Sequence, residues 1–284
     1  MNRFARLVFA VTAALAFLPP DGRAAAQDRG PYPVVQFRFV NPEETAPALE
    51  TSGTLRLLAD EDFPPFSFRG GDGVLEGISI DAAMEACREL GTPCEIVAKP
   101  WEALLPAFAK GEGDAIVAGP RLDAGLAARY LFTRPYFRAM ARFAVRTETP
   151  FDAADIRTLA GKRIAAARGS AHAAWIKANF PQSALAEFDS DTAALEALRT
   201  GAVDAAFADS LKLLFWSRGA VSRGCCKMLP GAFVDENLLS PAMGIIVRPD
   251  REDLMRAFDH GLDRVQLTGA FAAIFRRYVP ASPW

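Results

Sequence analysis

The chain has few of the side chains that most often perform chemistry or bind metal. Its 284 residues include only two histidines, His172 and His260. Because histidine is a principal zinc ligand, this scarcity argues against a His-based metal site, and we expect no metal and no cofactor. The sequence also shows no nucleophile–base pair, so acid–base catalysis would depend on acids such as Asp60, Glu61 and Asp209.

A strong charge of either sign is also missing. The sequence contains 32 lysines and arginines against 34 acidic residues, for a net charge of −2. Proteins that bind nucleic acid or anionic membranes usually present an excess of basic residues. We therefore expect no nucleic-acid partner and no membrane-surface role.

Beyond the N-terminus, no apolar run approaches the roughly 18 residues that span a bilayer. At the N-terminus, Arg3 and Arg6 precede a short apolar run, Leu7–Leu18, and small residues up to Ala26 form a cleavage site. This order predicts a signal peptide over residues 1–26 and a mature protein in the periplasm. The alternative is an uncleaved N-terminal anchor.

The four cysteines suit an oxidising compartment. Six residues, with a Gly-Thr-Pro turn, separate Cys87 from Cys94, and this spacing permits a disulfide. Cys225 and Cys226 are adjacent. Since a disulfide between neighbours is strained and rare, we expect two thiols there.

The segment after the predicted cleavage site differs in composition from the remainder of the chain. Residues 27–53 are rich in Pro, Glu and Thr and show no sustained hydrophobic period. We interpret them as a leader or linker, with a short edge strand over Val34–Val40 as an option.

Predicted strands and helices alternate from there on. Strands are expected over 55–59, 94–98, 114–118, 139–146, 162–166, 185–188, 204–208 and 242–247. Helices are expected over 78–90, 101–110, 170–179, 191–199 and 210–217, with closing helices within 250–278. Such alternation predicts an α/β protein with mostly parallel sheets flanked by helices.

Two segments share one order of residues, which indicates two similar lobes. GEGDAIVAGP and TGAVDAAFADS both run from a turn glycine through an acid and a buried strand to polar residues. We place lobe 1 at 54–142 plus 246–284 and lobe 2 at 143–245. Strands near Phe143–Val145 and Gly244–Val247 would form the hinge.

The order of motifs resembles family 3 of the bacterial solute-binding proteins, over Thr54–Tyr278. The strand LRLLAD leads into EDFPPFSF, and KPWEALLP, GEGDAIVAGP and LFTRPYF follow in turn. The resemblance implies a two-lobed periplasmic binding protein of type II, with ligand bound between lobes that close about a hinge. It also implies a disulfide between Cys87 and Cys94, as in the basic-amino-acid receptors of the family.

By the same resemblance, Asp60 and Phe63 match positions that touch the ligand side chain. Trp101 matches a residue that lies against the ligand, and together with Phe63 it could enclose an apolar or cationic group. Core packing is the structural alternative for these aromatic residues, and for Phe66 we favour it.

The chain departs from the family after the third predicted strand. Family members usually have Gly-x-Ser/Thr-x-Thr-x-x-Arg, whose Ser/Thr and Arg hold the ligand's α-carboxylate. Here Gly119 is followed by Arg121 at the Ser/Thr position and by Leu126 at the Arg position. Either Arg121 supplies a relocated guanidinium, or the ligand has no α-carboxylate, or Arg121 is a solvated loop residue.

The predicted lobe 2 keeps more of the family pattern. Ser170 and Ala171 open a helix whose N-terminus could seat a carboxylate, and Ser170 also suits a plain N-cap. His172 follows in the first turn. Asp209, at the end of a strand, matches the acid that binds the ligand's α-ammonium group.

The resemblance implies a receptor and not an enzyme. It would capture an amino acid or related polar solute and deliver it to an ABC permease, and we expect a monomer, which suits hinge closure. One alternative is a non-transport periplasmic partner of a dehydrogenase or a sensor kinase. Another is an enzyme similar to cyclohexadienyl dehydratases, which share this scaffold.

Overall fold

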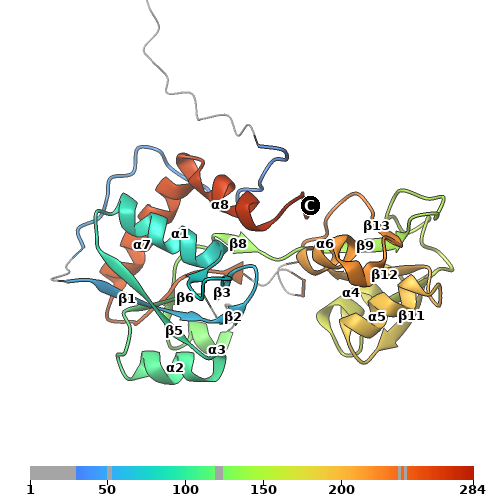
Figure 1. Ribbon diagram of the computed structural model, residues 1–284, viewed down its shortest axis with the longest axis horizontal. Coiled ribbons are helices and arrows are strands. Elements are labelled where there is room, and N and C mark those ends of the chain that lie inside the picture. Colours follow the sequence, from blue (N-terminus) through green and yellow to red (C-terminus); the bar gives the residue numbers. More distant parts are fainter. Residues whose placement is uncertain (1–29, 50–52, 119–123, 236–237, 240–241) are drawn as a thin grey trace, which may run out of the picture.

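The computed structural model describes residues 30–49, 53–118, 124–235, 238–239 and 242–284. These residues form a mixed α/β protein with two lobes, each built on a five-stranded sheet (Figure 1). The predicted fold class is confirmed. The predicted signal peptide, residues 1–26, lies outside the described residues. Within the described part of the chain, no helix has the length and apolar character needed to cross a membrane.

The sheet of lobe 1 has the order β5-β1-β6-β15-β7. Its strands are β1 (Leu55–Asp60), β5 (Cys94–Lys99), β6 (Ala115–Ala118), β7 (Leu131–Phe132) and β15 (Ile246–Val247). β5 and β6 run parallel to β1 on either side, whereas β15 runs antiparallel to β6 and β7. The chain thus returns to lobe 1 after completing lobe 2.

Helices cover both faces of this sheet, so β1 is buried except at Arg56. Because successive side chains of a strand alternate between faces, Leu57 packs with α1 (Ile78–Glu89), α7 (Glu252–Leu267) and α8 (Ala270–Tyr278). Leu58 points the other way and packs with α2 (Trp101–Ala109). A short helix, α3 (Ala124–Ala127), follows β6.

The sheet of lobe 2 has the order β11-β10-β12-β9-β13. Its strands are β9 (Ala141–Arg146), β10 (Arg163–Ala167), β11 (Ala184–Phe188), β12 (Ala205–Asp209) and β13 (Cys226–Met228). On one face, Phe143 and Phe207 pack with α4 (Ala171–Asn179). On the other, Ala144 and Ala206 pack with α5 (Asp191–Arg199) and α6 (Ser210–Arg218).

A two-stranded sheet of β8 (Phe137–Arg138) and β14 (Ala242–Met243) lies between the lobes (Figure 1). The strand expected over 242–247 is therefore divided in two, with Gly244 between β14 and β15. Residues 143–145, expected at the hinge, lie instead inside the lobe 2 sheet, where all three are fully buried. The strands that connect the lobes, β8 and β14, thus lie a few residues earlier in the chain than expected on both arms.

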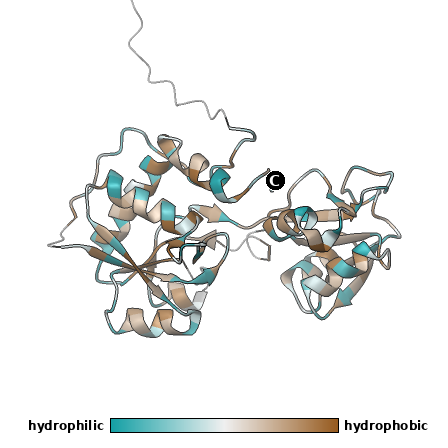
Figure 2. Ribbon diagram, viewed as in Figure 1, coloured by the Kyte–Doolittle hydropathy of each residue, from teal (hydrophilic) through white to brown (hydrophobic). Residues whose placement is uncertain are grey.

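A small antiparallel sheet follows β1 and was not predicted from the sequence. It consists of β2 (Asp62–Phe63), β3 (Ser67–Arg69) and β4 (Leu75–Glu76). Its strands are too short to show a hydrophobic period. In Figure 2, hydrophobic residues concentrate along the longer, central strands of both lobes, and this apolar pattern is the one that predicts a buried strand.

Residues 30–49 form no strand, so the optional edge strand over Val34–Val40 is wrong. The segment instead packs along lobe 1 through side chains. Tyr32 and Arg38 are buried, and the Tyr32 hydroxyl donates a hydrogen bond to the Val279 carbonyl, at 2.5 Å.

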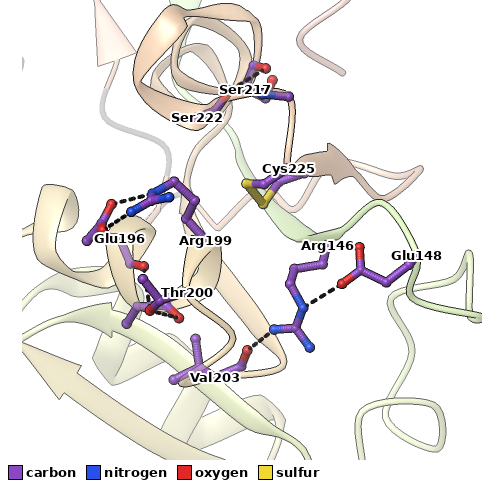
Figure 3. The surroundings of a disulfide bond; sticks show 12 residues. Arg146, Glu148, Glu196, Arg199, Thr200, Val203, Ser217, Ser222 and Cys225 are labelled. Carbon is purple, nitrogen blue, oxygen red and sulfur yellow. Dashed lines mark hydrogen bonds and ion pairs between the residues drawn. A yellow bond between two sulfur atoms is a disulfide. The ribbon is translucent and has the colours of Figure 1, made fainter.

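Both cysteine pairs form disulfides. Cys87 at the end of α1 is bonded to Cys94 at the start of β5, with Cα atoms 6.3 Å apart, as the resemblance implied. Cys225 and Cys226 are also bonded to each other, so the expectation of two thiols is wrong (Figure 3).

The Cys225–Cys226 pair follows a tight reversal between the 3-10 helix η1 (Ala220–Ser222) and β13. Arg223 and Gly224 both have positive φ there, and the Cys225 carbonyl accepts a hydrogen bond from the Thr147 amide at 2.8 Å. The turn places both sulfur atoms side by side at the start of β13. Disulfides between neighbouring residues are rare in general, but here the backbone of the turn brings the two sulfur atoms together.

Candidate functional site

A cavity of about 760 Å³ lies between the lobes. This volume is in the range of pockets that enclose a small molecule. Lobe 1 and the connecting segments contribute Phe63, Pro64, Pro65, Phe66, Phe137, Ala139 and Met243. Lobe 2 contributes Ser170, Ala171, His172, Asp191, Asp209, Leu211, Lys212, Phe215, Leu238 and Leu239.

The lobe 1 wall of the cavity is apolar and aromatic. The Phe63 ring stacks on Phe66 with centroids 5.2 Å apart, and Phe66 lies 5.0 Å from Phe137. Phe66 is only 6% exposed, so it belongs to the core of lobe 1 and also borders the cavity. This wall offers packing surface for an apolar or aromatic group.

Two residues expected in the cleft do not line this cavity. Asp60 ends β1 and is buried, and its Oδ1 accepts a hydrogen bond of 3.4 Å from the Asp62 amide. The Asp60 carbonyl accepts a hydrogen bond from the Ser67 hydroxyl. Trp101 begins α2 and is 49% exposed. The structure therefore brings Phe63, and not Asp60 or Trp101, to the cavity wall.

The first turn of α4 faces the cavity from lobe 2. Ser170 is its N-cap, and its Oγ accepts a hydrogen bond from the Ala173 amide at 3.1 Å. Gly169, with φ of +66°, makes the turn into the helix. Ser170, Ala171 and His172 all line the cavity, so the positive end of this helix dipole points toward it.

Asp209 lines the cavity at the end of β12 and caps α6. Its Oδ1 accepts hydrogen bonds from the amides of Leu211 and Lys212, at 3.0 and 3.1 Å. The cap is a structural role for this acid, beside the binding role that the resemblance implies. The two amide bonds fix the orientation of the carboxylate at the edge of the cavity.

An ion pair that sequence reasoning missed stands beside Asp209. Lys212 in the first turn of α6 pairs with Asp191, the first residue of α5, and both line the cavity. The order of elements along the chain could have predicted this pair. Helices α5 and α6 follow β11 and β12, which both run parallel to β10, so the two helices start at the same edge of the sheet. Among the described lining residues, Lys212 is the only lysine or arginine.

The segment that departs from the family pattern is described only in part. Gly119 and Arg121 lie outside the described residues. Leu126, at the position of the family's arginine, lies in α3 and is 6% exposed. In the described part of the chain, no group of three or more His, Cys, Asp or Glu side chains is arranged to hold a metal ion.

Comparison with known proteins agrees with this architecture. The sequence profile of the bacterial extracellular solute-binding proteins, family 3, matches residues 55–281. ABC transporter arginine-binding protein 1 of Escherichia coli K12 is 24% identical over 218 residues, which cover 77% of this chain and 87% of that protein. The L-cystine-binding protein TcyJ of the same strain is 23% identical over 229 residues, covering 81% and 84%.

Solved structures show the same fold. Substrate-binding domain 2 of Lactococcus lactis GlnP, in its open conformation, superposes with a TM-score of 0.70 at 18% identity, covering 83% of this chain and 99% of that one. The unliganded, open L-cystine receptor of Neisseria gonorrhoeae gives 0.69 at 16% identity, covering 80% and 93%. Because the family profile matches most of the chain, this protein belongs to family 3 of the bacterial extracellular solute-binding proteins.

Proposed function

We propose that the protein is an exported receptor that captures an amino acid or related small polar solute and delivers it to an ABC permease. The observation that carries the proposal is the cavity of about 760 Å³, lined from both lobes and bordered by the strands that connect them. Curated relatives are named as arginine-, cystine- and histidine-binding proteins, which indicates the class of solute.

The cavity offers complementary groups for a zwitterion. The first turn of α4, with Ser170 and Ala171, suits a carboxylate, and the oriented carboxylate of Asp209 suits an ammonium group. Phe63 supplies an apolar surface for the solute's side chain. A charge-assisted hydrogen bond at each end, with burial of the side chain, is sufficient for the roughly −8 kcal/mol of a micromolar complex.

Closure of the lobes would add the remaining proposed contacts. Asp60 and Trp101 stand outside the cavity and would reach a solute only when lobe 2 approaches lobe 1. Gly119 and Arg121 complete the proposed set. The proposed lobes are 54–142 plus 246–284 for lobe 1 and 143–245 for lobe 2, moving about β8 and β14. Sheet membership supports this division except at Ala141 and Arg142, which belong to β9 of the lobe 2 sheet.

The proposed role is binding without chemistry. The titratable groups on the described cavity wall are His172, Asp191, Asp209 and Lys212, and two of them pair with each other while Asp209 caps a helix. This set supplies binding and orientation. Two disulfides support export to an oxidising compartment, the proposed destination of a chain with a signal peptide over residues 1–26.

A thermal-shift screen of the mature protein tests the proposal, with L-arginine, L-cystine and L-histidine as first probes and polyamines and organic acids next. A solute at a hundred times its dissociation constant should stabilise the native state by about 2.7 kcal/mol. The matched variant is Asp209→Asn, since asparagine is an equally good N-cap but lacks the charge. It should unfold at the wild-type temperature without solute and lose the stabilisation by amino acids.

If no compound raises the unfolding temperature, the receptor function is refuted. A non-transport partner protein would then explain the chain better, because that role needs no bound solute. A stabilising compound that lacks a carboxylate would instead support the receptor and explain Leu126 at the position of the family's arginine.

A further inference from the structure

We propose that residues 30–49, here called the N-terminal strap, hold in place both the lobe 1 root of the interlobe connection and the aromatic wall of the cavity. The strap lies outside residues 55–281, the range that the family profile matches. It passes over α8 and α7 on lobe 1 (Figure 1). The strap would thus be a positioning element for the cleft.

The strap is fixed at its start by the C-terminal end of the chain. The Tyr32 hydroxyl bonds to the Val279 carbonyl, and the Arg276 guanidinium donates to the Tyr32 carbonyl at 2.6 and 3.0 Å. The Trp284 indole N–H donates to the Pro33 carbonyl at 2.9 Å. These contacts join segments about 250 residues apart, so they form only when lobe 1 is complete.

Arg38 connects the strap to the segment that leaves lobe 1. Its guanidinium, 1% exposed, forms ion pairs with Asp259 at 2.8 Å and Asp263 at 2.7 Å, both in α7. The same group donates to the Arg134 carbonyl at 2.5 Å. Asp259 in turn accepts from the Arg134 amide at 2.8 Å. The backbone of Arg134, between β7 and β8, is thereby held by both the strap and α7.

The held segment is also paired with the returning arm. The Thr133 amide donates to the Ile245 carbonyl at 3.0 Å, and the Ile245 amide donates to Thr133 Oγ1 at 2.9 Å. The Tyr136 amide donates to the Met243 carbonyl at 3.0 Å. Because β8 begins and β14 ends at this level, Arg38 fixes the lobe 1 root of both arms through Arg134.

Phe37 supports the cavity wall from behind. Its ring meets Phe137 edge-on, with centroids 5.4 Å apart, and Trp284 at 6.4 Å. Phe137 lines the cavity and packs against Phe66, which stacks on Phe63. Since interiors are close-packed, removal of the Phe37 ring would leave a void directly behind this wall.

Hydrogen–deuterium exchange of the solute-free mature protein tests the proposal. Phe37→Ala should speed exchange of the Tyr136 and Ile245 amides about tenfold, because their protection depends on local opening of the connection. Amides of β12 in lobe 2 and of β1 in lobe 1, strands that pair with neither β8 nor β14, should exchange as in wild type. The matched control is Phe39→Ala, a neighbouring strap aromatic that is 92% exposed, and it should change nothing.

Two outcomes would overturn the proposal. Equal acceleration throughout lobe 1 would mean that the strap only stabilises the lobe, and no acceleration at Tyr136 and Ile245 would mean that it does not position the connection. If Phe37→Ala fails to fold, Phe37→Leu replaces it. Exchange of the Tyr136 and Ile245 amides should then speed up by less than tenfold, and still by more than exchange of the β1 amides. Because the measurement uses no solute, its outcome does not depend on whether the proposed transport function is correct.

Discussion

Lys212 forms an ion pair with Asp191 at the point where the N-termini of α6 and α5 meet at the edge of the cavity. The Lys212 side chain is half exposed and that of Asp191 is 22% exposed, so solvent screens the pair and the strength of such pairs is typically below about 1 kcal/mol. The pair matters mainly for the charge that the lobe 2 wall presents. Lys212 offsets the charge of Asp191, so Lys212 and the two acids together set the charge of this wall.

Replacing Lys212 should change the charge preference of the cavity. In Lys212→Met, Asp191 no longer has its cation, so the affinity for L-arginine should rise about two- to fivefold, as expected for a partly screened charge. Isothermal titration calorimetry against wild type measures the change. Lys110→Met, an exposed lysine on lobe 1 outside the cavity, is the control and should bind as wild type does. A loss of affinity for L-arginine would contradict the proposed role of the pair.

Asp209 should contribute to stability apart from binding. Asp209→Ala removes the side-chain oxygen that accepts from Leu211 and Lys212, and loss of such a cap costs about 1 kcal/mol of the free energy of unfolding. Asp209→Asn keeps the accepting oxygen and should leave the free energy of unfolding near its wild-type value. Urea unfolding without solute compares the two. Equal destabilisation by both variants would show that charge, and not the cap, is what stabilises α6.

All four cysteines should resist alkylation in the folded protein from an oxidising compartment. Both bonds in the structure predict no iodoacetamide uptake before reduction and four adducts after reduction and unfolding, as read by intact mass spectrometry. Two adducts without reductant, mapped by peptide analysis to Cys225 and Cys226, would contradict the bond between neighbours.

Loss of the Cys87–Cys94 bond should lower the free energy of unfolding by roughly 2 kcal/mol, a modest amount because the loop that the bond closes is short.

Tyr136 should make stability fall in alkaline solution. Burial raises the pKa of Tyr136 to about 12 from its usual value near 10, because the phenolate would lose its hydration. The unfolded chain therefore releases this proton first, and its contribution to stability, complete below pH 10, is lost as pH rises through 12.

Tyr136→Phe isolates that effect. The variant loses the hydrogen bond between the Tyr136 and Ser79 hydroxyls, 2.6 Å long and buried, and should be less stable at pH 8 by about 1–2 kcal/mol. Between pH 10 and 12 its stability should decline less steeply than that of wild type. Denaturant unfolding at several pH values measures both slopes, and parallel slopes would contradict the assignment.

The elements with a regular apolar pattern were predictable from local sequence. Helix α5 has the predicted bounds, Asp191–Arg199, and β1 extends the predicted strand 55–59 by one residue. In α5 the helical spacing of apolar side chains identifies the element, whereas β1 is a short, nearly continuous apolar run, as expected of a strand buried on both faces. The two-residue strands β8 and β14 carry no such pattern, and this is why the connection between the lobes was misplaced.

The sequence by itself determined the α/β class, the family and four residues of the cavity wall, Phe63, Ser170, Ala171 and Asp209, because these follow from local patterns and motifs. Tertiary structure alone decided which groups meet. Arg38 reaches Asp263 across 225 residues, and Lys212 meets Asp191 because two helices start at one sheet edge. No local pattern records such contacts, since each depends on how the strap, helices and sheets pack together.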